Sequence, residues 1–441
     1  MLSPTRFRLS ALALLVAAAP YAGAYELYSD EDTHLNASIE AAFGLFHSQE
    51  RYATAGRYGS EGSSSWREGY IKYGLDFDRK LGDAGTGYGA FALLSSATWG
   101  DGDAAGFTDG SERNTEVEDA YVGWRSGNLI QALGEDGVDI SVGRQKIVVG
   151  DGFLINGDAL NLGQFAGDTY DRGGAYWLAG RKSFNETAVL RLGGTTGWRS
   201  DLMWLQSDNR AQANSELFVG TLEHVADAGT VGLTYIDVTD VDEQYASPAQ
   251  LERDGMKTYS LRAQGNAGVE NLFLSGEYAW QDKDSASDEK AWYLEAGWTF
   301  SDVAWSPTVT YRYSRFSETY DPLFYGFNRG YGTWFQGEVA ANYAGPFNSN
   351  TRVHHLGLRA TPLENLAVGA LWFDFDSLDK DLGDTSGREL DLYAEWGATQ
   401  NLVVMPVIGF YKPEQSADTG GLQLGNNDRN LYSQLVFAFA F

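Results

Sequence analysis

The chain has 441 residues, and its 32 Lys and Arg against 60 Asp and Glu give a formal net charge of -28, which argues against nucleic acid as a partner. Cysteine is absent, so thiol catalysis, thiolate metal sites and disulfides are excluded. Aromatic residues make up 14% of the chain and Gly numbers 53, a combination typical of short strands, aromatic girdles and tight turns.

The first residues have the pattern of an export signal. Two arginines precede an apolar run at residues 9–19, and residues 22–24 read Ala-Gly-Ala, a small-residue cleavage site. We therefore predict a signal peptide over residues 1–24 and a mature, single-domain chain over residues 25–441. Without the two arginines of the leader, 30 basic residues face 60 acidic ones, a net charge of -30. Beyond the leader, no apolar run approaches the ~18 residues of a membrane helix.

Apolar and polar residues alternate strictly in many segments. In residues 34–45, Leu35, Ile39 and Phe43 fall on one face of a strand, and Asn36 and Glu40 fall on the other. The same period recurs in segments 71–77, 119–125, 138–142, 259–264, 292–300, 355–360 and 389–396. An unpaired ion buried in a soluble core costs several kcal/mol, so charges on the second face of so many strands require water there. The pattern predicts one face toward lipid and one toward an aqueous lumen.

The last residues of the chain carry the cleanest alternation. Leu431, Leu435 and Phe437 share one face, and the strand stops on an aromatic residue, Phe441. This ending resembles the closing strand of outer-membrane barrels, so we predict Phe441 to be a membrane-assembly signal. The alternative is an edge strand of a soluble sandwich, a class of fold that avoids long apolar edges.

Connections between the alternating segments differ in length. Short turns are predicted near residues 82–83, 183–185, 227–228, 268, 362–364 and 399–400, and long polar loops at 47–66, 99–114, 148–171, 237–255, 317–351 and 412–430. About 20 segments alternate, and the up-and-down order is kept if 185–206 is one bent strand and 334–343 belongs to a loop. We therefore predict an all-β, transmembrane antiparallel β-barrel of about 18 strands, with long extracellular loops, short periplasmic turns and an aqueous channel.

Charged residues of both signs are expected to line the channel. The predicted basic pore-lining residues are Lys72, Arg125, Arg191, Arg262, Arg312 and Arg359. The predicted acidic ones are Asp76, Asp119, Glu277, Glu295 and Asp391. A ring of cations would concentrate anions, and arginine binds carboxylates through two hydrogen bonds. Pairing of the same arginines with neighbouring carboxylates, which would only stiffen the wall, is the second interpretation and stays open.

The long loop at 317–351 is rich in aromatic residues. Phe324, Tyr325, Trp334 and Phe335 are candidates for a gate over the channel mouth, because aromatic rings stack on sugars and on one another. A packed cap that never moves is the alternative.

Catalytic and metal sites have little support in the sequence. The five histidines are scattered, no serine lies in a Gly-x-Ser-x-Gly turn with an evident partner, and no acidic loop has the EF-hand spacing for calcium. We expect no enzyme activity, no catalytic residues, no bound metal and no cofactor. An outer-membrane hydrolase is the least favoured alternative.

Several short motifs resemble the alginate-export (AlgE-like) family of outer-membrane porins. They are the Val-Gly-Arg-Gln of residues 142–145, the Val-Gly-Asp-Gly of 149–152, the acidic segment 168–172, and segments 321–326, 335–338 and 348–354 of the late loop. The resemblance implies an 18-stranded monomeric barrel that passes an anionic polysaccharide outward through a basic constriction.

Three functional interpretations follow for a chain of the Gram-negative outer membrane. The first is export of an anionic polysaccharide or related anionic solute, the alternative is a nutrient-uptake porin for small organic acids or sugars, and the third is a structural barrel without conductance. The expected partners are outer-membrane lipid and lipopolysaccharide, the anionic solute and, for export, periplasmic components. Nucleic acid is not expected to bind, and the resemblance implies a monomer.

Overall fold

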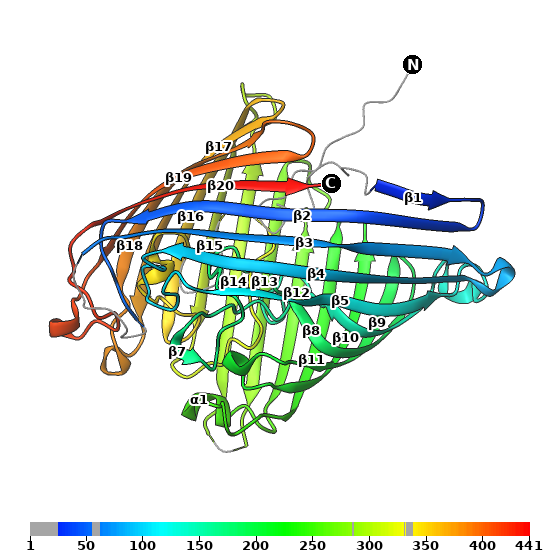
Figure 1. The fold of residues 1–441 in the computed structure, drawn as a ribbon, viewed down its shortest axis with the longest axis horizontal. Coiled ribbons are helices and arrows are strands. Elements are labelled where there is room, and N and C mark those ends of the chain that lie inside the picture. Colours follow the sequence, from blue (N-terminus) through cyan, green and yellow to red (C-terminus); the bar gives the residue numbers. More distant parts are fainter. Residues whose placement is uncertain (1–24, 55–61, 285, 330, 332–337) are drawn as a thin grey trace.

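The computed structural model describes residues 25–54, 62–284, 286–329, 331 and 338–441, and these fold into a closed antiparallel β-barrel (Figure 1). Eighteen strands form the wall, each hydrogen-bonded to its neighbour in the chain, and the first wall strand closes the ring by pairing with the last. The wall strands are β2 (Thr33–Ser48), β3 (Ser64–Lys80), β4 (Thr86–Gly100), β5 (Arg113–Arg125), β6 (Val138–Lys146), β8 (Ser183–Leu192), β9 (Gly197–Gln206), β10 (Glu216–Ala226), β11 (Gly229–Asp240), β12 (Lys257–Gly265), β13 (Leu272–Asp282), β14 (Glu289–Thr299), β15 (Thr308–Phe316), β16 (Thr351–Leu363), β17 (Leu366–Ser377), β18 (Gly387–Gly397), β19 (Leu402–Pro413) and β20 (Asn430–Ala440).

Side-chain exposure alternates along the strands as the sequence predicts. In β2, Ile39, Phe43 and Leu45 are about 40% exposed on the outside, whereas Ala42 and Phe46 on the opposite face are buried. In β20, Leu431 and Phe439 point outward and Tyr432 and Gln434 inward. A wall with this apolar outer face, with every strand paired on both sides, satisfies its backbone inside a bilayer. The protein is a multi-pass β-barrel of the outer membrane.

Two details of the predicted strand order are wrong. Residues 185–206 are not one bent strand, because β8 and β9 pair with each other as a hairpin and turn where Gly193 has a φ of 95°. The predicted short turn at 183–185 is instead the start of β8. Leu192 and Gly197 bound the turn, so the glycine pair that interrupts the alternation is a reversal of the chain and not a kink.

Pro406 lies inside β19 without causing a bulge against β20. Proline removes one ladder hydrogen bond, but β19 keeps an unshifted register with β20 through this position. On the other side, the pairing of β19 with β18 is interrupted between Val404 and Val407 and resumes in the same register. The segment 338–343, the described part of the predicted 334–343, lies in the connection between β15 and β16, as expected.

Two short strands lie outside the wall. β1 (Tyr25–Ser29) pairs with the first residues of β2, just beyond the point where β20 ends, and β7 (Phe165–Asp168) belongs to a loop. Helical structure is limited to α1 (Pro248–Leu251) and a few single turns, and no helix in the described ranges is long and apolar enough to cross a membrane. The leader, residues 1–24, lies outside the described residues and stays a prediction.

The ends of the strands define the two sides of the barrel. Chain direction reverses at residues 81–85 on the side where β20 ends, and the longest connections lie at the opposite ends of the strands (Figure 1). In barrels of this kind short turns face the periplasm and long loops face outward, so Phe441 lies at the periplasmic end.

Candidate functional site

Two long loops fold back into the barrel instead of extending away from it. We call residues 147–182, between β6 and β8, the first inward loop, and the described residues of 317–350 between β15 and β16, namely 317–329, 331 and 338–350, the second inward loop. They meet where Ile155 bridges Phe324 and the Asn156 N–H donates to the Phe324 carbonyl (2.7 Å). The lumen is therefore partly filled by chain.

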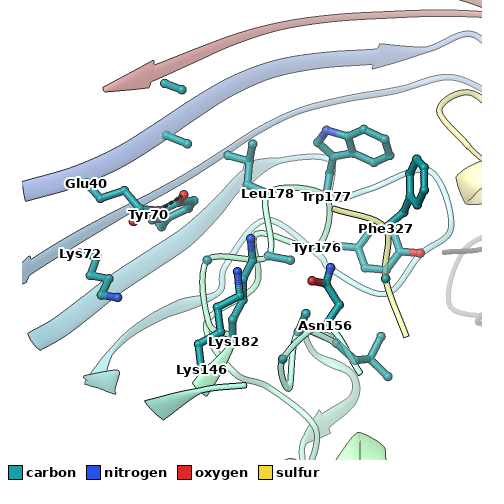
Figure 2. A pocket seen from close by; sticks show the side chains of 18 of the residues that line it. Glu40, Tyr70, Lys72, Lys146, Asn156, Tyr176, Trp177, Leu178, Lys182 and Phe327 are labelled. Atoms are coloured by element: carbon teal, nitrogen blue, oxygen red, sulfur yellow. Dashed lines mark hydrogen bonds between the residues drawn. The ribbon is translucent and has the colours of Figure 1, made fainter. Parts of the chain in front are cut away.

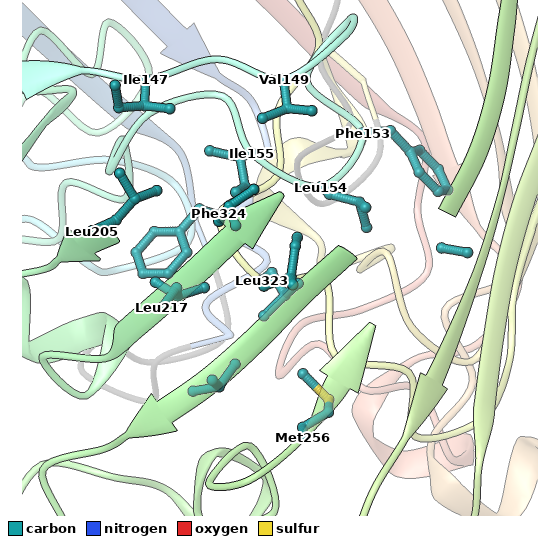
Figure 3. Close-up of a cluster of buried hydrophobic side chains, with 14 of the residues drawn as sticks. Ile147, Val149, Phe153, Leu154, Ile155, Leu205, Leu217, Met256, Leu323 and Phe324 are labelled. Carbon is teal, nitrogen blue, oxygen red and sulfur yellow. The ribbon is translucent and has the colours of Figure 1, made fainter. Parts of the chain in front are cut away.

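Apolar packing holds the two loops against the wall. Ile155 and Phe324 are at most 1% exposed, and Figure 3 shows them beside the wall residues Leu205 and Leu217. The Phe324 ring also lies 4.9 Å from the ring of Phe184, measured between centroids. Apolar side chains on a loop between two strands of a pore have only this interior to bury themselves in, which explains the inward fold.

Three glutamates of the wall bind loop backbone. Glu68 accepts hydrogen bonds from the Trp177 and Leu178 N–H groups (3.0 and 3.1 Å), and Glu118 from those of Lys182 and Ser183 (2.6 and 2.9 Å). Glu389 accepts from Val339 (2.9 Å) and also from Ala341. A buried backbone N–H requires a partner, and these carboxylates supply it. These three inward acids therefore hold the inward loops in place.

All six basic residues predicted for the pore lie in ion pairs. They sit on the inner face of their strands, and each has a carboxylate within 4 Å. Lys72 pairs with Asp119 (2.5 Å), Arg125 (3.8 Å) and Arg191 (3.7 Å) with Asp139, Arg262 with Glu223, Arg312 with Glu338 (2.8 Å) and Glu295 (3.8 Å), and Arg359 with Glu395 (3.1 Å). This geometry agrees with the interpretation that these arginines and Lys72 pair with neighbouring carboxylates. Basic side chains without an ion pair must therefore be sought elsewhere.

Four of the five predicted acidic residues have hydrogen-bond or ion-pair partners, and the fifth, Asp391, is buried without one among the described residues. Asp119 pairs with Lys72, and Glu295 binds both Arg312 and Arg329 of the second inward loop (2.8 Å). The remaining three are distributed around the wall. Asp76 accepts from Asn36 (2.9 Å), Glu277 accepts from Ser260 (2.5 Å), and Asp391 is fully buried next to Glu389 on the same strand face.

The candidate gate residues fall into two groups. Phe324 is 1% exposed and packed against the wall, and Tyr325 borders the cavity described below. Trp334 and Phe335 lie outside the described residues. The packing of Phe324 is that of an anchor that fixes the loop.

A cavity of about 380 Å³ remains between the inward loops and the β20–β2–β3 side of the wall. Figure 2 shows Lys72, Lys146 and Lys182 on one side of it and Tyr176, Trp177 and Phe327 on another. The cavity therefore has a cationic side and an aromatic side.

The acids that border this cavity already have partners. Glu40 accepts from the Tyr70 hydroxyl (2.7 Å), and Glu118 holds loop backbone and lies 3.6 Å from Arg181. In the described part of the chain, neither Lys146 nor Lys182 forms an ion pair. These two ammonium groups can receive an anion without breaking an existing contact.

The alternation along the strands could not predict that Lys146 and Lys182 face the cavity. Lys146 follows a register shift between Gly143 and Gln145, where Gly143 has a φ of 119°, so parity no longer tells which way its side chain points. Lys182 belongs to a loop, where no period applies. A signal was present in the Gly-Arg-Gln motif itself, since a glycine inside a strand marks a bulge.

The functional groups of a metal site are not brought together. Among residues 25–441, apart from the gaps in the description, no group of three or more His, Asp or Glu side chains could hold a metal ion.

Comparison with known proteins gives a fold but no sequence family. No protein-family model and no curated protein sequence matches the chain. Solved structures do match over nearly their whole length. OccK5 (OpdH) of Pseudomonas aeruginosa has a TM-score of 0.57 and 10% identity, covering 93% of this chain and 98% of that one. The fold is that of an outer-membrane porin.

Two further P. aeruginosa structures support the porin fold. OpdQ has a TM-score of 0.56 and 12% identity, with 94% of this chain and 99% of that one covered, and OccK11 (OpdR) has 0.53 and 12%, with 92% and 96% covered. At such identities the likeness concerns the fold alone. It bears out the 18-stranded porin barrel, but it does not single out the alginate-export family that the short motifs resemble.

Proposed function

We propose that this protein is an outer-membrane uptake channel for small anionic solutes, above all carboxylates that carry a ring or another apolar body. The observation that carries the proposal is the pair of lysines, Lys146 and Lys182, which face the cavity between the inward loops and the wall without ion-pair partners among the described residues. An ammonium group in a narrow pore raises the local concentration of anions. The aromatic side of the same cavity, with Tyr176 and Trp177, suits the remainder of the solute.

The two inward loops favour small solutes over a polymer, because they occupy part of the lumen. Both inward loops are fixed by apolar packing and by wall carboxylates, and the cavity between them measures about 380 Å³. A folded-in plug of this kind leaves little room for a continuous polysaccharide chain. We therefore place uptake of small organic acids before the export of an anionic polysaccharide.

The solute is proposed to pass through the channel by moving its carboxylate from one lysine to the next. A carboxylate leaving Lys182 meets Lys146 and then Lys72, whose partner Asp119 competes for the same ammonium. That competition keeps each contact weak enough to release the solute, as conduction requires. The barrel is proposed to act as a monomer in outer-membrane lipid, without enzyme activity, metal or cofactor.

The lysine pair can be tested in planar bilayers. We predict that K146Q/K182Q lowers the permeability ratio of benzoate to potassium by about fivefold or more, because one charge contact in a water-like medium is worth about 1 kcal/mol. The reversal potential in a potassium benzoate gradient measures this ratio.

A matched control removes the same charge from outside the pore. Lys290 and Lys412 are exposed on the outward face of β14 and β19, so K290Q/K412Q should leave the ratio unchanged. An equal change in both variants, or none in K146Q/K182Q, would reject the lysine pair as the selectivity element. Passage of uronate oligosaccharides at rates similar to benzoate would favour polysaccharide export.

A further inference from the structure

A groove of about 680 Å³ runs along the lipid-facing side of the wall, across β20, β2, β3, β4 and β5. Strand registers place its outward residues in two rows. One row runs through Phe437, Phe43, Gly69, Ala97 and Arg113, and the row nearer the periplasm runs through Phe439, Ala41, Ile71, Ser95 and Thr115.

The groove arises because small residues lie between large ones. Gly69 and Ala97 form its floor, and the rings of Phe43 and Trp99, 6.2 Å apart between centroids, stand over it. A Cβ on Gly69 would lie 3.2 Å from the Phe43 ring and 3.5 Å from Trp99. A lipid-facing wall of evenly sized side chains would be smooth. This hollow therefore has a shape that can receive an acyl chain.

Two arginines stand at the outer end of the groove. Arg113 lies over the Trp99 ring, 4.6 Å from its centroid, and its other contacts are the carbonyls of Thr98 and Glu112. Arg67 is exposed on the same face, directly opposite Trp99 in the strand register. In the described ranges neither guanidinium forms an ion pair. Asp101, on the same rim, accepts from the Ser65 N–H (3.0 Å) and pairs with neither.

The position of these arginines fixes the leaflet. Gly100 ends β4 and Arg113 begins β5, on either side of a long outer loop, and the chain terminus Phe441 lies at the opposite end of the wall. Arg67 and Arg113 therefore lie at the headgroup level of the outer leaflet, and the groove extends from there toward the bilayer centre.

We propose that this groove is a binding site for lipid A, the phosphorylated and multiply acylated lipid of the outer leaflet. One acyl chain lies over Gly69 and Ala97 between the rings, and a glucosamine phosphate binds Arg67 and Arg113. Guanidinium groups match phosphate with paired hydrogen bonds, and two arginines without an ion pair among the described residues, on a chain of formal net charge -28, suit an anion carrying more than one negative charge. A phospholipid of the inner leaflet could not reach this rim.

Native mass spectrometry of the purified barrel tests the proposal, with bisphosphorylated hexa-acyl lipid A, its monophosphorylated form and phosphatidylglycerol as separate probes. We expect one retained lipid A per wild-type barrel, weaker retention of the monophosphorylated form, and little phosphatidylglycerol. R67Q/R113Q should lower lipid A retention about tenfold. The matched control is R315Q/R388Q, which removes two exposed, outward arginines from the same rim on β15 and β18.

The groove itself is tested by Ala97→Leu, which fills the floor while keeping both arginines. Reduced lipid A retention with normal heat-modifiable migration supports a chain-binding groove. An equal loss of lipid A retention in R67Q/R113Q and R315Q/R388Q would show that the effect comes from the total charge of the rim, and it would overturn the site. Phosphatidylglycerol retained as strongly as lipid A would overturn the choice of ligand. If Ala97→Leu fails to fold, the two arginine variants still decide.

Discussion

At the scale of single residues, inward charges in this barrel divide into two kinds. Most acids hold either an arginine or loop backbone, as Glu118 and Glu389 do, whereas the basic residues Lys146 and Lys182 face the cavity without an ion pair among the described residues. The alternation of residues along each strand predicted that charged side chains would line the lumen. It could not tell which of these side chains form ion pairs with one another. Pairing depends on neighbours from other strands and on loops that carry no period.

Asp321, at the start of the second inward loop, gives a prediction for acid pH. It forms two 2.8 Å contacts with Arg253, and both side chains are buried. Burial raises the pKa of the Asp321 carboxyl, but the Arg253 guanidinium outweighs it and holds the pKa below the ordinary 3.8. A lowered pKa stabilises the docked loop above pH 3.8, and this contribution is lost as the pH falls through the lowered value.

The Asp321→Asn variant should reproduce the acid effect at neutral pH. It leaves Arg253 buried without its counter-ion, a loss of about 3–5 kcal/mol. We predict higher and noisier single-channel current for the variant at pH 7 and for the wild type at strongly acidic pH. Asp376→Asn, in an exposed pair with Arg352, is the control and should leave the current unchanged. Single-channel current and noise unchanged in the Asp321→Asn variant would mean that the pair of Asp321 and Arg253 does not fix the loop.

At the scale of elements, the wall strands were predictable and the inward loops were not. A period of two is visible in β2 or β20 because each face has its own solvent, lipid or water. The hairpin of β8 and β9 was missed because its turn is short and glycine-rich, so the two strands read as one. Loops 147–182 and 317–350 fold inward through contacts between distant segments, such as Ile155 with Phe324.

The C-terminal strand β20 gives a prediction about assembly of the barrel. Phe441 and Ile39 exchange backbone hydrogen bonds (2.8 and 2.7 Å), which completes the seam between β20 and β2. Deleting Phe441 removes both bonds and an outward aromatic ring at the periplasmic end, so we predict slower insertion and less heat-modifiable barrel in isolated outer membranes. Phe441→Tyr, which keeps the ring and the backbone, should assemble normally. Normal assembly of the deletion would show that this residue is not an assembly signal.

At the scale of the whole molecule, the barrel combines a porin wall with a narrow, loop-filled interior. The predicted number of about 18 strands agrees with the closed ring and with the matched porin structures, although the prediction counted the β8–β9 hairpin as one strand. The solute could not be predicted from sequence, because selectivity depends on which charges stay free after the loops have packed. The cavity with its cationic and aromatic sides is therefore the feature on which the proposed function depends.

The most direct test of that function is the reversal potential of the wild-type channel in planar bilayers, measured in gradients of potassium benzoate and of benzylammonium chloride. The two organic ions match in size and ring and differ in charge. We predict that benzoate permeates in preference to potassium and that benzylammonium is excluded relative to chloride. A channel that prefers benzylammonium, or a folded barrel with no conductance, would contradict the proposal that this protein takes up small anionic solutes.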